Sequence, residues 1–231
     1  MANSKQTTQI IFHKLSRCLF LILGFLLLTA CISAPKNVQL TNEFWKKKDR
    51  KVIVAITKAP IPQVYQVGNQ GLLDYAINRT MNRKLNKYLE RNDLTWYYAL
   101  PENFTAKLKA RNILSKPHTD QNLELEAKKY NDFVTSLNGD QLLIIKLTAL
   151  GVQRNYYSII PTSAPKSYCV MTGELINGKD KTVMWRQQTA ITMPINGTWD
   201  QPPNYPNVAE SLKLAIHTAR QELLDSFFSD H

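Results

Sequence analysis

The residue in the most distinctive chemical setting is a cysteine close to the N-terminus. Cys31 directly follows the small residues Thr29 and Ala30, which close an uncharged apolar run from Cys18 to Leu28. The leader before this run carries three basic residues and no acidic one. A positive leader, a short apolar run and small residues together form a secretory signal. The run is too short to span a membrane, because eleven residues at ~1.5 Å each cover about half of a ~30 Å hydrocarbon core. The sequence therefore predicts an exported protein.

The Leu28-Thr29-Ala30-Cys31 sequence also resembles the lipobox of bacterial lipoproteins. This resemblance implies that residues 1–30 are a signal peptide that is removed, and that Cys31 is acylated and anchors the mature chain to a membrane. Ile32 stands where an Asp would resemble an inner-membrane retention signal. The expected location is therefore the periplasmic face of the outer membrane. The alternative is an ordinary signal peptide that has a cysteine nearby.

Other residues that could hold a metal or a cofactor do not fall into a pattern. His118, His217 and His231 have no Cys, Asp or Glu at metal-ligand spacing, so no metal site is predicted. The glycines form no phosphate-binding loop, and no cofactor is predicted. Cys169 is the one cysteine left after the leader is removed and Cys31 is acylated, and its apolar surroundings predict a buried, unreactive thiol.

No catalytic constellation is visible either, so we expect a protein that is not an enzyme. There is no serine in a nucleophile elbow. A hydrolase acting on the cell wall is the alternative, and it needs paired carboxylates across a cleft. Convergence of Glu124, Asp140, Glu174 or a histidine in the folded chain would favour that alternative.

The positive charge suggests an anionic partner. The chain holds 29 Lys and Arg against 18 Asp and Glu, and removal of the leader leaves 26 against 18, a net charge of +8. Anionic lipid head groups or an acidic cell-wall polymer would be attracted, the former by the cluster at Lys46–Lys51 near the anchor. The alternative is a solvated tether. Nucleic acid is not expected, because the basic residues lack interleaved stacking aromatics.

Two aromatic segments are candidates for a partner surface. Tyr156 and Tyr157 follow an apolar run, whereas Trp199 and Tyr205 lie in a proline-rich stretch before the last helical pattern. Rigid aromatic side chains lose little entropy on binding, so an envelope protein is the expected partner. The alternatives are that these rings cover the sheet edge and the last helix, or that they enclose a pocket for a small ligand.

The elements that must position these residues form an α/β domain over residues 51–231, behind a lipidated tether at 31–50. Apolar and β-branched runs predict strands at 52–56, 94–98, 141–150, 168–176 and 182–193. Helical periodicity predicts helices at 72–89, 101–111, 123–137 and 208–228. In the first of these helices, Leu72, Leu73, Ile77, Met81 and Leu85 are expected to face the core. Strands alternating with helices and followed by a meander predict a mixed sheet with helices packed on it.

This order of elements resembles the periplasmic domain shared by the amino-terminal half of TolB, the curli-secretion lipoprotein and the lipoprotein activators of penicillin-binding proteins. The resemblance lies in the Gly139–Ile144 stretch that opens the central strand and in the hairpin formed by Gly173–Asn177 and Thr182–Trp185. The group has no shared catalytic residues, and its members act by assembly and by activating partners. The resemblance therefore implies a non-enzymatic subunit or activator in secretion or cell-wall synthesis.

Overall fold

A mixed seven-stranded β-sheet with helices on both faces organises the chain, which confirms the predicted α/β class. The structure is a computed structural model that describes residues 36–47, 49–118, 127–137 and 139–229, and these form one compact unit from Lys36 onward. Cys31, Glu124 and His231 lie outside the described residues. No helix within the described ranges is both long and apolar enough to cross a membrane.

The sheet is built around one long strand, β4. In chain order the strands are β1 (Lys51–Ile56), β2 (Gln63–Asn69), β3 (Leu114–Pro117), β4 (Gln141–Tyr157), β5 (Ile160–Pro161), β6 (Lys166–Ile176) and β7 (Val183–Pro194). The first half of β4 pairs with β1 and the second half with β2, both in parallel, while β3 pairs with the outer edge of β1. On its other side β4 pairs with β6, which pairs with β7, and both pairings are antiparallel.

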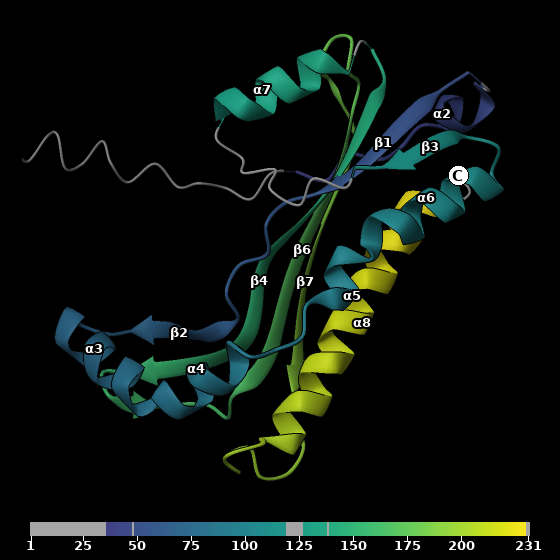
Figure 1. Cartoon of the computed structure of the whole chain (residues 1–231). Helices are drawn as coiled ribbons and strands as arrows, with labels where there is room; N and C mark the ends of the chain where they lie inside the picture. Colours follow the sequence, from purple (N-terminus) through teal and green to yellow (C-terminus); the bar gives the residue numbers. More distant parts are fainter. Residues whose placement is uncertain (1–35, 48, 119–126, 138, 230–231) are drawn as a thin grey trace, which may run out of the picture. The chain divides into compact units, whose positions relative to one another are not determined.

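The helices cover the two faces of this sheet. In chain order they are α2 (Asn42–Lys46), α3 (Leu72–Met81), α4 (Arg83–Leu89), α5 (Thr95–Tyr98), α6 (Leu100–Ala110), α7 (Ala127–Ser136) and α8 (Pro206–Phe228). Because successive strand residues point to opposite faces, Val52 and Val54 join the core under α6 and α8. Ile53 and Ala55 join a smaller cluster with Val134 of α7. Figure 1 shows α7 and α8 on opposite sides of the strands.

A tyrosine fills the position where β4 changes partner from β1 to β2. The buried Tyr97 hydroxyl lies 2.8 Å from the carbonyl oxygen of Thr57 and 3.0 Å from that of Ile145, and accepts a hydrogen bond from the Leu147 amide at 3.2 Å. Backbone groups that lose their strand partner are thereby satisfied. Beyond this position Gly151 has a φ of 148°, and a Cβ there would overlap the backbone of Gln63.

The prediction of a strand over residues 94–98 is wrong, because Thr95–Tyr98 form the helix α5. The Asp93 carboxylate accepts hydrogen bonds from the Thr95 amide at 2.9 Å and from its hydroxyl at 2.8 Å, an arrangement that favours the start of a helix. The aromatic composition that suggests a strand instead serves to insert Tyr97 into the core.

Several other predicted elements are confirmed, and four are additional. The predicted strands at 52–56, 141–150, 168–176 and 182–193 correspond to β1, β4, β6 and β7, and the helices at 101–111 and 208–228 to α6 and α8. The polar edge strands β2 and β3, the short strand β5 and the short helix α2 are not predicted. Leu40 and Phe44, from the segment expected to be a tether, are buried, and the Phe44 ring lies 6.2 Å from that of Phe227. This part of the segment therefore packs on the domain.

Candidate partner-binding surface

The apolar side chains of α3 point outward, contrary to the predicted orientation. Leu72 is 94% exposed, Leu73 73% and Met81 54%. The second half of the predicted helix follows the prediction, since Leu85 and Leu89 of α4 are buried. The single predicted helix is thus two helices that meet at Asn82, and only the second of them presents its apolar residues to the core.

The side of α3 that faces the sheet is polar. Asn78 is fully buried, and its Nδ2 donates to the carbonyl oxygen of Ser158 at 2.9 Å. Asn82 is also buried. Its Nδ2 donates to the Tyr156 hydroxyl at 2.7 Å, and its Oδ1 accepts from Nη1 of Arg154 at 3.0 Å. Buried polar groups need such partners, and the bonds of the two asparagines to Ser158, Tyr156 and Arg154 form because this side of α3 turns inward.

The turn between β4 and β5 adds to the exposed apolar surface. The bond from Asn78 to Ser158 places this turn beside α3, and Figure 1 shows α3 and the end of β4 together. Tyr157 is 64% exposed, because it alternates with the buried Tyr156. We call the exposed apolar residues of α3 and this turn the apolar end: Leu72, Leu73, Tyr75, Ile77, Met81, Tyr157, Ile159 and Ile160. Exposed apolar side chains that gather at one end of a molecule are typical of an interaction surface.

The charge on α3 is close to zero. Its charged residues are Asp74, whose Oδ2 accepts a hydrogen bond from the Gly71 amide at 3.1 Å, and Arg79. Helices that lie on an anionic membrane carry an excess of Lys and Arg on their polar side. The inward side of α3 instead carries asparagines, so the chemistry of this helix matches an apolar protein surface better than a lipid one.

The four aromatic residues predicted as a partner surface do not form one. Tyr157 belongs to the apolar end. Tyr156 and Tyr205 are each 2% exposed and lie in the core. Trp199 is half-buried, and the guanidinium carbon of Arg154 lies 4.7 Å from its ring centroid. Sequence reasoning therefore identifies one residue of the apolar end and misses those of α3.

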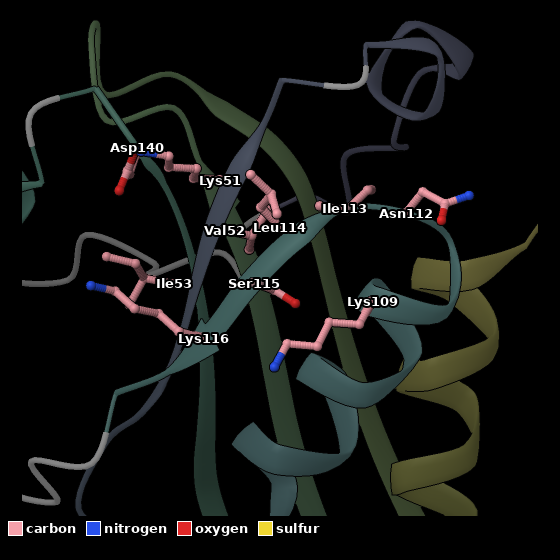
Figure 2. Close-up of a pocket in the computed structure, with 10 residues that line it drawn as sticks. All are labelled: Lys51, Val52, Ile53, Lys109, Asn112, Ile113, Leu114, Ser115, Lys116 and Asp140. Atoms are coloured by element: carbon pink, nitrogen blue, oxygen red, sulfur yellow. The ribbon is translucent and has the colours of Figure 1, made fainter.

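A cavity of about 650 Å³ lies along the outer edge strand β3 and faces solvent (Figure 2). Its walls carry Lys51, Lys109 and Lys116 beside the apolar side chains of Ile53 and Leu114. Asp140 is the one carboxylate among its lining residues. A single carboxylate does not supply the acid and base that glycoside hydrolysis requires.

Of the carboxylates that would favour a hydrolase, the structure describes Asp140 and Glu174, and it places them in different surroundings. Glu174 of β6 is held by Nζ of Lys146 and Nε of Arg186, each at 2.7 Å. Burial alone would raise the pKa of Glu174, but its bonds to these two cations keep the pKa below its usual range. Asp140 lies outside this group, at the cavity beside β3. Glu174 therefore has the environment of a structural ion pair.

The remaining chemically reactive side chains are also isolated. Within the described ranges no three His, Cys, Asp or Glu residues could hold a metal ion together. The ring of His118 lies 4.7 Å from that of Phe133, and His217 lies on α8. Cys169 is buried in β6, as predicted, and burial raises the pKa of its thiol to about 12.

The solved structures that the chain is similar to include a bacterial lipoprotein. Lipoprotein GNA1162 from Neisseria meningitidis is 11% identical over 76% of this chain and 99% of that chain, with a TM-score of 0.33. The hypothetical protein CT253 from Chlamydia trachomatis is 10% identical over 78% and 99%, with a TM-score of 0.39. The LpoB C-terminal domain from Salmonella enterica is 7% identical over 60% and 81%, with a TM-score of 0.23. No family model and no curated protein matches the chain. TM-scores this low support no statement about function, which therefore rests on the side chains described above.

Proposed function

We propose that this chain is a lipid-anchored protein of the bacterial outer membrane that faces the periplasm and acts as a non-enzymatic subunit or activator of an envelope assembly. The assembly would be a secretion apparatus or the cell-wall synthesis machinery. The anchor would be Cys31, on the strength of its lipobox-like sequence. The observation that carries the proposal is the apolar end, where Leu72 and Leu73 lie almost fully in solvent on a helix whose polar side is buried.

A protein partner would gain substantially by covering the apolar end. Full burial of one leucine side chain contributes about 1.5–3 kcal/mol. Leu72, Leu73 and Met81 together could therefore supply the two or three dominant contacts that typical interfaces contain. The near-neutral charge of α3 favours a protein surface over anionic lipid as the occupant.

Intact-mass spectrometry of the membrane fraction tests the anchor. A mature chain that begins at Cys31 and carries acyl chains is expected. Two or more chains are needed for stable anchoring, since each buried methylene contributes about 0.8 kcal/mol. An unprocessed chain beginning at Met1, or an unmodified Cys31, would contradict the anchor.

Photo-crosslinking in cells tests the partner surface. A photoreactive amino acid placed at Leu73 is expected to give a discrete crosslink to one envelope protein. The matched control is Leu214 of α8, which is also an exposed leucine, at 52%, but lies outside the apolar end. The crosslink from Leu73 should disappear in a chain carrying Leu72→Glu. Equal crosslinking from both positions, or crosslinking to lipid alone, would refute the role of this surface. Digestion of purified cell wall by the protein would refute the non-enzymatic assignment.

A further inference from the structure

Three adjoining cavities form one groove along α4. The first, of about 520 Å³, shares Lys84, Pro202 and Tyr205 with the second, of about 410 Å³. The second shares Tyr88, Arg91 and Pro203 with the third, of about 690 Å³, which continues between α5 and α8. Because neighbouring cavities share their walls, a single extended ligand could occupy all three.

The groove is strongly basic. Six cations from α4, the turn after it and α8 line the groove: Arg83, Lys84, Lys87, Arg91, Lys213 and Arg220. We call the three cavities together the basic groove. Two carboxylates, Asp93 and Asp200, also line it, and Asp93 is engaged by Thr95. In the part of the chain that the structure describes, none of the six cations forms an ion pair. Their charge is thus available to an anionic ligand.

The spacing of the cations along α4 matches that of side chains on an extended peptide. Arg83 and Lys87 of α4 are four residues apart, which is about 6 Å along a helix axis, and Arg91 follows four residues later in the turn beyond the helix. Alternate side chains on an extended chain point the same way and are about 6.6 Å apart. Acidic residues at every second position of such a chain could therefore meet successive cations.

The opposite wall of the groove suits a polypeptide. Pro202 and Pro203 stiffen it, and the ring of Tyr88 on α4, which lies 5.1 Å from that of the buried Tyr205, gives the groove an apolar floor. Trp96 and Arg220 line the third cavity, and their nitrogens Nε1 and Nε are buried with no hydrogen-bond partner in the described part of the chain. A flat layer of lipid head groups would not reach this floor.

We propose that the basic groove binds an extended acidic segment of a partner polypeptide, in which Asp or Glu occupies alternate positions. Electrostatic complementarity of this kind selects the partner and speeds its association. The proposal depends neither on the lipid anchor nor on the apolar end, so it can fail or succeed separately from the proposed function.

Fluorescence anisotropy with the full chain, purified in a neutral detergent, tests the proposal. The probe is a fluorescein-labelled peptide in which glutamate alternates with serine. The test variant is Lys87→Glu/Arg91→Glu, and the control, with the same change in net charge, is Lys58→Glu/Lys166→Glu, at exposed positions outside the groove. We expect the test variant to bind at least about tenfold more weakly and the control to bind within about twofold of the native chain.

Three results would overturn the proposal. Equal loss of binding in both double variants would mean that the peptide responds to overall charge. Equal binding of a peptide with the same glutamates in one contiguous block would contradict the alternating register. The native chain could bind vesicles of phosphatidylglycerol more strongly than it binds the peptide. If only the test variant lost this vesicle binding, the groove would be assigned to a lipid surface. Thermal melts of all variants establish that each is folded before binding is compared.

Discussion

Replacement of Asn82 by alanine is expected to destabilise the chain much more than replacement of Leu73 by alanine. The pattern of the sequence predicts the reverse, because it places the leucine in the core. In the structure Asn82 is 2% exposed, whereas Leu73 is largely in solvent. The pair of variants therefore tests directly which side of α3 faces the sheet.

The expected magnitude follows from the contacts of the asparagine. Its side chain makes three hydrogen bonds, to the Asn78 carbonyl oxygen, the Tyr156 hydroxyl and the Arg154 guanidinium. Each contributes about 0.5–1.5 kcal/mol, and Asn82→Ala also leaves the buried Tyr156 hydroxyl without this partner. The free energy of unfolding should fall by about 3 kcal/mol. Leu73→Ala removes little buried surface, and we expect a change within about 0.5 kcal/mol.

Thermal and urea denaturation followed by circular dichroism measure both variants. For a domain of this size, about 1 kcal/mol lowers the melting temperature by about 2–4 °C, so Asn82→Ala should melt about 6–12 °C lower. If Leu73 were buried, Leu73→Ala would cost about 2–5 kcal/mol. A large effect of Leu73→Ala together with a silent Asn82→Ala would refute the outward orientation of α3 and the apolar end with it.

Three further outcomes are expected. Ile144→Asp should unfold the chain, because an unpaired charge in the buried centre of β4 costs several kcal/mol. His118→Ala should change the free energy of unfolding by less than about 1 kcal/mol, and thermal melts compare the two variants. Glu174→Gln should be less stable than the native chain at neutral pH. Because the folded chain lowers the pKa of Glu174, this difference should shrink as pH falls below about 4.3, which urea titrations at several pH values would show. The peptide that contains Cys169 should resist alkylation at pH 8 until urea unfolds the chain, as mass spectrometry can follow, since burial raises the pKa of its thiol to about 12.

The interior strands could be predicted from sequence because each is a continuous apolar run. Val52–Ile56 and Leu142–Ile145 are buried on both faces, so nearly every residue in them is apolar. The edge strands β2 and β3 lack this signal, since they face solvent and contain Gly68 and Pro117. Their pairing depends on a partner far along the chain, which local periodicity does not report.

The candidate surface could be predicted only in part. Alternation along β4 is sufficient to separate the buried Tyr156 from the exposed Tyr157. The orientation of α3 is different, because Asn78 and Asn82 become inward-facing only through Ser158, Tyr156 and Arg154, which lie more than seventy residues away. Two asparagines spaced four residues apart, at Asn78 and Asn82, are the one local sign of this arrangement.

The parallel pairing of β4 also has a consequence for how the chain folds. Gln63 of β2 pairs with Gly151, 88 residues later, and Val52 of β1 pairs with Gln141, 89 residues later. Neither early strand can find its partner until most of the chain is present. Loop closure over such distances is slow, and the apolar run of β1 stays uncovered while it waits. This topology therefore implies slow folding. During that period the unfolded or partly folded chain can aggregate or be captured by chaperones.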